Sequence, residues 1–309
     1  MTEFINEWRN DCPWIEAHTS GSTGKPKAIR LLKSDMLSSA TATNAFFGID
    51  RYSTLAIPLS ADYIAGKMMA VRAEAAGCRL LEMPVSNDVR VECPIDLLAV
   101  VPSQIESLLG QPEAAGLVKN LLVGGAPLTD EPARRLVAAG FNAWLGYGMT
   151  ETCSHVALRR VDSDEIFKAM EGIRFSTDSR DCLTIESERF SWGSLMTNDV
   201  VELLSPTSFR WLGRADNAIN SGGLKLHSEQ LEKEYRAAIG DLPPFYLAGE
   251  PDPKWGERLV MVAENPPEGL LERIKSLLPD RRKAPGRIVG VDTLPRTDNG
   301  KIRRIVPDR

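Results

Sequence analysis

Residues 118–152 read VKNLLVGGAPLTDEPARRLVAAGFNAWLGYGMTET, and their pattern indicates the class of fold. An apolar run at 118–123 predicts a buried strand, the segment from Thr129 predicts a helix capped by that threonine, and residues 142–145 predict a second strand. Short apolar strands that alternate with helices form a mostly parallel sheet covered on both faces. The stretch therefore predicts an α/β fold.

The same alternation is present upstream of this stretch. Strands are expected at 55–58, 79–83 and 97–101, and a helix is expected at 61–76. The chain before residue 152 therefore predicts one mainly parallel sheet.

After Glu151 strand-like runs follow one another without helices between them. These runs read SHVALRRV, CLTIES, SLMTNDVVELL and SFRWLGR, with polar turns between them, and they predict an antiparallel β subdomain. The parallel sheet and this subdomain are expected to form one large N-terminal domain over residues 1–215.

Residues 216–309 have a pattern of their own and are expected to form a small α+β domain. A length of 309 residues also favours two domains over one. The elements expected in the small domain are a glycine loop at 221–223, helices at 228–238 and 270–278, and strands around Tyr246 and at 259–263.

The composition is that of an ordinary globular protein and excludes several classes. A net charge of -5 argues against nucleic acid as a partner, and five cysteines without a CxxC pair favour reduced thiols. The acidic N-terminus is not a signal peptide, and no apolar run is long enough to cross a membrane. We therefore expect a cytoplasmic protein with no membrane partner.

A loop rich in glycine and hydroxyl side chains lies near the start of the chain, in HTSGSTGKPKAI at 18–29. It is not a Walker P-loop, because Pro26 follows Lys25 where that motif needs Ser or Thr. Strands on either side predict a hairpin, in which Gly21 and Gly24 would turn backbone N–H groups toward an anion. Composition alone leaves a phosphate loop and a mobile surface hairpin equally open.

Three later segments carry further candidate residues. Thr150 and Glu151 in GYGMTET follow a strand end and offer a phosphate donor and a Mg²⁺ carboxylate, although a helix cap is an alternative. GRADNAINSGGLKL contains Arg214, and LPRTDNGKIRR contains Lys301. Each of these two segments alone is also compatible with a solvated, charged turn.

Taken in order, the pieces TSGSTGKPK, YGMTE, MTND, GRADNAINSGGLK and PRTDNGK resemble the adenylate-forming family of acyl-CoA synthetases, luciferases and peptide-synthetase adenylation domains. The resemblance runs from residue 19 to residue 301. Two pieces depart from the family pattern: MTND replaces a Thr-Gly-Asp segment, and PLSADYIAG lacks an aromatic–His pair. Acyl-pocket residues of relatives are therefore not carried over to this chain.

The resemblance implies ATP as a substrate and Mg²⁺ as its metal, with Glu151 as the metal ligand and Thr150 at the α-phosphate. Lys301 would be the catalytic lysine that stabilises the adenylation transition state. The residues assigned to ATP are Thr19, Ser20, Gly21, Ser22, Thr23, Gly24 and Lys27 at the phosphates, Gly124, Gly125 and Tyr147 along the adenine, and Asp199 and Arg214 at the ribose.

For the second half of the reaction the resemblance implies a rotation of the small domain. Asp216 would be the hinge, and the loop with Gly222, Gly223 and Lys225 would meet the thiol of coenzyme A. Relatives are commonly dimers, which leaves a homodimer open.

The run GYGMTETCSHVALR, with VGGAPL upstream, is most similar to the compact o-succinylbenzoate–CoA ligases of menaquinone biosynthesis. Such a dicarboxylic acid needs a cation or donors for the carboxylate that does not react. Lys67 and His155 are the first candidates, with Arg72 and Arg159 behind them, while Ser154 would shape the pocket wall. Each has an alternative explanation: Lys67 and Arg72 would lie on a solvated helix face, and His155 would be a hydrogen-bonding residue at the edge of the core.

Other functions stay open from the sequence. The chain is also compatible with an adenylating enzyme for another small acid, or one that uses a carrier protein as acceptor. A non-catalytic nucleotide-binding relative is a third hypothesis, which the joint presence of Glu151, Asp199, Arg214 and Lys301 disfavours.

Overall fold

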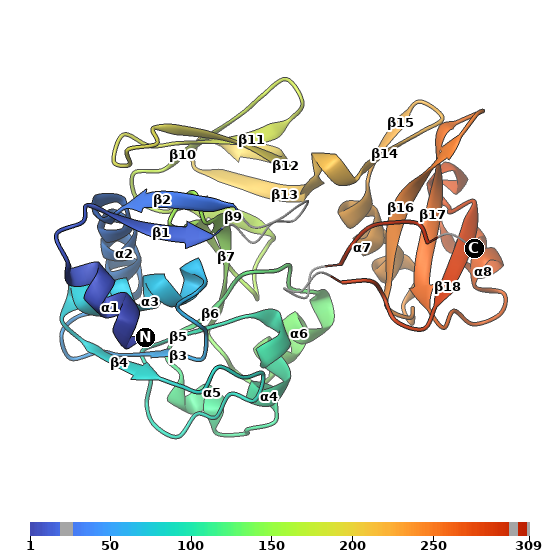
Figure 1. The fold of residues 1–309 in the computed structure, drawn as a ribbon. Helices are drawn as coiled ribbons and strands as arrows, with labels where there is room; N and C mark the ends of the chain where they lie inside the picture. The colour runs from blue at the N-terminus through green and yellow to red at the C-terminus, as the bar shows by residue number, and fades with distance from the viewer. Residues whose placement is uncertain (19–26, 297–301, 308–309) are drawn as a thin grey trace. The chain divides into compact units, whose positions relative to one another are not determined.

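The computed structural model describes residues 1–18, 27–296 and 302–307 (Figure 1). The chain divides into two compact units. The first comprises 1–176, 185–195 and 203–210, and the second comprises 177–184, 196–202 and 211–309. The expectation that a separate mobile domain begins after residue 215 stays a prediction.

A parallel sheet forms the centre of the first unit, as the sequence predicted. Its strands lie in the order β4-β3-β5-β6-β7 and pair in parallel. Strand β5 is buried at every position, which explains its uninterrupted apolar run. The five strands are β3 Thr54–Ile57, β4 Arg79–Glu82, β5 Leu97–Val100, β6 Leu121–Val123 and β7 Ala143–Met149.

Helices between these strands also follow the prediction, with two differences. The helix expected from residue 61 begins at Ile64, after a turn so tight that a Cβ on Gly66 would lie 2.1 Å from the Ser60 carbonyl oxygen. Thr129 is the N-cap residue of α6, as predicted, but its side chain makes no capping hydrogen bond. The helices are α3 Ile64–Ala76, η1 Pro102–Gln104, α4 Ile105–Leu109, α5 Ala114–Leu117 and α6 Asp130–Ala138.

The first fifty residues form α1 Thr2–Arg9, the antiparallel pair β1 Trp14–His18 and β2 Ala28–Leu32, and α2 Lys33–Phe47. The hairpin was predicted, whereas α2 was not. Helix α2 has no apolar stripe, because its buried positions include Ser39, Thr43 and Asn44. It packs beside α3 and β8, so its polar residues face other polar groups inside the protein.

Antiparallel strands follow β7, as expected. β8 Ser154–Arg160 pairs with β7, β9 Ile166–Ala169 pairs with β8, and residues 208–210 of β13 pair with β9. The other strands of this region are β10 Arg174–Thr177, β11 Cys182–Glu186, β12 Ser194–Ser205 and β13 Ser208–Arg214, each of which contributes residues to both units.

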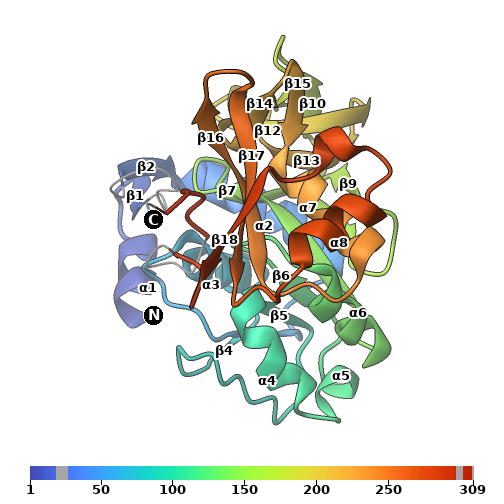
Figure 2. The same cartoon turned by 90° about the vertical axis from the view of Figure 1, so that its right-hand side faces the viewer.

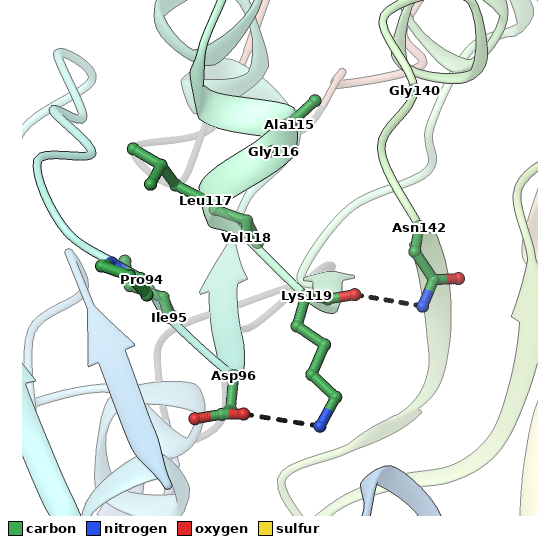
Figure 3. A pocket seen from close by; sticks show the side chains of 10 residues that line it. All are labelled: Pro94, Ile95, Asp96, Ala115, Gly116, Leu117, Val118, Lys119, Gly140 and Asn142. Atoms are coloured by element: carbon green, nitrogen blue, oxygen red, sulfur yellow. Dashed lines mark hydrogen bonds and ion pairs between the residues drawn. The ribbon is translucent and has the colours of Figure 1, made fainter.

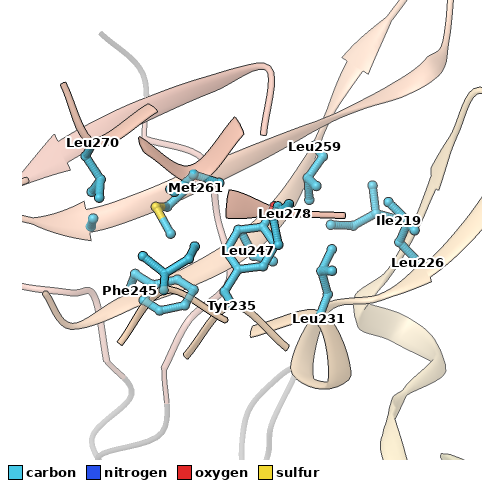
Figure 4. Close-up of a cluster of buried hydrophobic side chains, with 13 residues drawn as sticks. Ile219, Leu226, Leu231, Tyr235, Phe245, Leu247, Leu259, Met261, Leu270 and Leu278 are labelled. Atoms are coloured by element: carbon cyan, nitrogen blue, oxygen red, sulfur yellow. The ribbon is translucent and has the colours of Figure 1, made fainter. Parts of the chain in front are cut away.

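The second unit contains the small α+β fold that the sequence predicted. Its sheet has the order β15-β14-β17-β16, and β18 pairs in parallel with β17. Helices α7 and α8 cover one face of this sheet (Figure 2) and bury Leu231, Tyr235 and Leu270 against Phe245 and Met261 (Figure 4). The elements are η2 Ala215–Asn217, β14 Ala218–Ser221, β15 Leu224–His227, α7 Ser228–Ile239, β16 Phe245–Asp252, β17 Gly256–Glu264, α8 Leu270–Leu277, η3 Arg281–Lys283 and β18 Arg287–Val291.

None of the helices in the described part of the chain is long and apolar enough to cross a membrane.

Candidate active site

The carboxyl ends of two neighbouring parallel strands, β5 and β6, position the first candidate residues. Val100 and Val123 are paired and end β5 and β6, and Val123 pairs on its other side with Leu145 near the start of β7. Gly124 follows β6 directly and donates its N–H to the Val100 carbonyl over 3.0 Å. Gly125 has a φ of 82°, which glycine adopts without strain. Gly124 and Gly125, which are predicted to lie along the adenine, are therefore found at the edge where sheets of this class bind ligands.

The turn after β7 holds Thr150 and Glu151. Thr152 stabilises this turn. Its hydroxyl accepts from the Met149 N–H over 2.9 Å and donates to the Ser154 carbonyl oxygen over 2.6 Å. Sequence reasoning missed Thr152, and the only available signal was its place in the motif. The turn leads into β8 and not into a helix, so the helix-cap explanation of Thr150 is wrong.

Glu151 is half-buried and makes no ion pair with a residue of the described part of the chain. Residues 1–18, 27–296 and 302–307 contain no group of three or more His, Cys, Asp or Glu side chains that could hold a metal ion. A single carboxylate of this kind suits Mg²⁺, which proteins commonly bind through one or two carboxylates together with substrate phosphates. The donor set therefore fits the predicted metal.

Tyr147 belongs to an aromatic cluster inside the first unit. Its ring lies 5.0 Å from the ring of Phe209 in an edge-to-face contact and 5.7 Å from that of Phe167. These contacts fix the orientation of a residue that was predicted to lie along the adenine. Lys27, predicted at the phosphates, is exposed directly before β2.

In the second unit the two predicted ribose residues lie together. Arg214 Nη1 lies 3.7 Å from Asp199 Oδ1, and Arg214 Nη2 lies 2.7 Å from Oδ2 of the predicted hinge residue, Asp216. The indole N–H of Trp211 donates to Asp199 over 3.1 Å, a partner that sequence reasoning missed. The carboxylate and guanidinium proposed for the ribose hydroxyls are therefore held by one network.

The predicted thiol loop is a two-residue hairpin turn between β14 and β15. Gly222 and Gly223 have φ values of 58° and 80°, as a type I′ turn requires. A Cβ on Gly222 would lie 2.9 Å from the ring of Trp255, so the loop and this ring are in close contact. Lys225 follows in β15, opposite Asn220.

The candidates for the acid pocket occupy different surroundings. Arg72 is only 1% exposed, and its Nη2 donates to Ser154 Oγ over 2.7 Å. Burial lowers the pKa of its guanidinium to about 9, and its Nε is buried without a hydrogen-bond partner. No carboxylate in the described part of the chain forms an ion pair with Arg72.

The surroundings of His155, Lys67 and Arg159 differ from those of Arg72. Burial and the charge of Arg72 lower the pKa of His155 well below its usual range, so its ring is neutral. The ammonium of Lys67 lies 4.8 Å from the Phe4 ring centre, and the guanidinium of Arg159 lies 5.5 Å from that of Phe167. Arg72, which the sequence argument placed behind Lys67 and His155, is the buried cation beside Ser154.

A cavity of about 500 Å³ lies at the opposite ends of the parallel strands (Figure 3). Asp96 and Lys119 line it and pair over 3.5 Å, and Asn142 donates to the Lys119 carbonyl over 3.2 Å. Its polar side chains thus bond one another, and the cavity contains none of the predicted site residues.

Several predicted residues lie outside the described part of the chain: Thr19, Ser20, Gly21, Ser22, Thr23, Gly24 and Lys301. Their assigned roles stay predictions.

Comparison with known proteins identifies the family. Residues 7–173 match the model of the AMP-binding enzyme family. An acyl-CoA synthetase (AMP-forming)/AMP-acid ligase II-like protein from Dyadobacter fermentans is 32% identical, with a TM-score of 0.65 over 97% of this chain and 90% of that one. A 2-succinylbenzoate–CoA ligase from Enterococcus faecalis is 26% identical over 93% of this chain and 67% of its own length.

A probable 2-succinylbenzoate–CoA ligase from Mycobacterium tuberculosis is 28% identical over 97% of this chain and 85% of its own length. The match to the family model covers more than half of the chain, and the similarity to the Dyadobacter protein extends over nearly all of it. The chain therefore belongs to the AMP-binding enzyme family and groups within it with the AMP-forming acyl-CoA synthetases.

Proposed function

We propose that this enzyme converts o-succinylbenzoate to o-succinylbenzoyl-CoA through an acyl-adenylate, as in menaquinone biosynthesis. In the first step a carboxylate oxygen of the acid would attack the α-phosphorus of ATP, and pyrophosphate would leave. In the second step the sulfur of coenzyme A would attack the acyl carbonyl, and AMP would leave. The names of the Enterococcus and Mycobacterium relatives support this substrate.

The burial of Arg72 without a carboxylate partner in the described part of the chain is the observation that supports this acid as the substrate. A buried guanidinium without a carboxylate partner is energetically costly, so its retention needs a compensating role. The o-succinylbenzoate molecule has a second carboxylate, on its aromatic ring, which does not react. A carboxylate beside Arg72 would supply the missing negative charge and accept from the free Nε.

The place of Arg72 in the fold supports this assignment. Its guanidinium bonds Ser154, which lies three residues after the proposed Mg²⁺ ligand Glu151. The reacting carboxylate must approach the α-phosphate near Thr150, so a receptor at Ser154 suits a compact acid. A long fatty chain would instead bring apolar carbon against a buried cation, which is unfavourable.

The residues of the chain would divide the work of adenylation. Thr150 would donate to the α-phosphate, and Asp199 with Arg214 would hold the ribose hydroxyls. Glu151 would hold Mg²⁺, which supplies positive charge as pyrophosphate leaves. Lys301 would stabilise the negative charge between the acid and the α-phosphate.

ATP–pyrophosphate exchange tests the proposal. We expect exchange with o-succinylbenzoate and none with fatty or amino acids at matched concentration. Exchange with another acid alone would refute the substrate, and no exchange with any carboxylic acid would refute the catalytic function. Release of AMP with coenzyme A, compared with a phosphopantetheinylated carrier protein, would then identify the acceptor.

A further inference from the structure

A chain of hydrogen bonds leads away from Arg72 into helix α2. Arg72 Nη2 lies 2.7 Å from Ser154 Oγ, which lies 3.3 Å from His155 Nδ1. His155 Nε2 lies 3.1 Å from Thr43 Oγ1, and the Thr43 hydroxyl lies 3.0 Å from the Ser39 carbonyl oxygen. This series of hydrogen bonds therefore connects α3, β8 and α2 through buried or half-buried groups.

Only one arrangement of the protons in this series of hydrogen bonds gives every donor an acceptor. Arg72 can only donate, so Ser154 Oγ accepts from it. If Ser154 donates to Nδ1, then Nε2 carries the ring proton and donates to Thr43. The Thr43 hydroxyl then donates to the Ser39 carbonyl oxygen, which can only accept.

The reverse arrangement leaves one proton unused. If Thr43 donated to Nε2, the ring proton would lie on Nδ1 and point at Ser154 Oγ. That oxygen would then accept from both Arg72 and His155, and its own proton would have no acceptor among the described residues. Buried polar groups without partners are unfavourable, so the first arrangement is preferred.

The charges around His155 also keep its ring neutral. Helix α3 brings the cation Arg72, whereas helix α2 brings Ser39 and Thr43, which are uncharged. Glu171 lines a small cavity that His155 also lines, but it is exposed and pairs with Arg189 over 3.4 Å. A second positive charge on the ring would repel Arg72 and remove the acceptor for Ser154.

We propose that Thr43 and His155 are positioning residues for the acid, because they make the Ser154 hydroxyl a fixed, neutral acceptor for Arg72. A carboxylate in place of Ser154 would hold Arg72 equally well, but it would neutralise the guanidinium and compete with the substrate. An acceptor whose own proton is bound elsewhere orients the cation and leaves its charge for the acid. This inference rests on the proposed function, in which Arg72 binds the carboxylate that does not react.

The first test measures the proton arrangement directly and requires no substrate. The chain has three histidines, so ¹⁵N-histidine spectra can be assigned to His155 with the His155→Asn variant. We expect a proton on Nε2, none on Nδ1, and no titration of the ring between about pH 5.5 and 8. A proton on Nδ1, or titration within that range, would overturn the inference whatever the substrate is.

The second test measures specificity with Thr43→Val, which keeps the shape of the side chain and removes the hydroxyl. Its KM for o-succinylbenzoate is expected to rise about tenfold, as the loss of one oriented hydrogen bond implies. The KM for ATP and the KM for benzoylpropionate, which lacks the aromatic carboxylate, are expected to stay unchanged. Thr43→Ser keeps the hydroxyl and serves as the matched control.

Equal rises in KM for both acids, or no rise for either, would refute the positioning role of Thr43. Failure of the proposed function has a different signature: Arg72→Met would then leave the KM for o-succinylbenzoate unchanged, while the spectra of His155 would still report the proton arrangement.

Discussion

At the scale of single residues, buried Arg72 and half-buried Arg304 show how the partners of a charged side chain decide its effect on stability. Arg304 forms a bidentate ion pair with Glu232, with Nη2 and Oε2 3.1 Å apart, and also lies 3.5 Å from Glu229. Arg72 has a hydroxyl and a thioether sulfur as its partners. The first arrangement pairs the charge within the fold, whereas the second leaves it, among the described residues, without a carboxylate partner, which the acid is proposed to supply.

We therefore expect opposite stability effects from the same substitution. Arg304→Met should lower the free energy of unfolding by about 3–5 kcal/mol, because Glu232 is left buried without its partner. Arg72→Met should leave the free energy of unfolding in the absence of substrate unchanged or raise it, because a desolvated charge is removed. Urea denaturation of both variants measures this difference. A loss with Arg72→Met as large as with Arg304→Met would contradict the unpaired state of Arg72.

His155 gives a prediction about pH. Its folded-state pKa is lowered by burial and by Arg72, so below about pH 6.5 the unfolded chain binds a proton that the folded chain does not. Stability from His155 is thus present above that pH and is lost as the pH falls, by up to about 1.4 kcal/mol per pH unit. The pKa of His227 is also lowered, so only the difference from His155→Asn isolates the contribution of His155.

Urea denaturation at a series of pH values from about 5 to 7.5 measures this difference. His155→Asn should flatten the acid side of the stability curve relative to the parent. Parallel curves for the two proteins would show that His155 titrates alike in the folded and unfolded states.

At the scale of elements, the turn between β7 and β8 carries the motif that sequence analysis singled out. A Cβ on Gly148 would lie 2.0 Å from the Ser154 carbonyl oxygen and 2.6 Å from the His155 Cα. The pairing of the two strands shifts register at Tyr147 and Gly148, so the backbones approach closely there. The glycine spacing of GYGMTET therefore serves this close approach.

Gly148→Ala is expected to lower stability by several kcal/mol, about 2–4, and to reduce ATP–pyrophosphate exchange, because backbone must move beside Thr150 and Ser154. Gly116→Ala in α5 is the control, since a Cβ there meets nothing within 4 Å. The free energies of unfolding and the exchange rates of both variants test this. Similar behaviour of the two variants would show that the turn tolerates a side chain.

The elements also show what sequence can and cannot predict. The strands β3, β5 and β6 were predictable because buried parallel strands read as short apolar runs. Helix α2 was missed because its buried face includes Ser39, Thr43 and Asn44, which bond neighbouring elements and leave no apolar stripe. The same cause hid part of the site: partners such as Thr43 of His155 lie 112 residues away in sequence.

At the scale of the whole molecule, the residues proposed for the reaction are divided between the two compact units. Thr150 and Glu151 belong to the first, and Asp199, Arg214 and Asp216 belong to the second. The motifs of all these residues were readable from sequence because their order along the chain is fixed in the family. The choice between Arg72 and Lys67 was not readable, because it depends on which cation is buried beside Ser154.

The proposed role of Lys301 separates the two half-reactions. Lys301→Ala is expected to abolish adenylation, since the lysine would stabilise charge only in that transition state. Thioester formation from supplied acyl-adenylate should be largely kept. Exchange assays and single-turnover thioester assays measure the two steps, and equal loss of both would contradict this role.

The most direct test of the central claim compares o-succinylbenzoate with benzoylpropionate in the parent and in Arg72→Met. Removing the cation should lower kcat/KM for o-succinylbenzoate roughly ten- to hundredfold, the range for a hydrogen bond to a charged group, and leave kcat/KM for benzoylpropionate unchanged. Arg72→Lys, which keeps the charge, should lose less. Equal changes for both acids, or no change for either, would contradict Arg72 as the receptor of the second carboxylate.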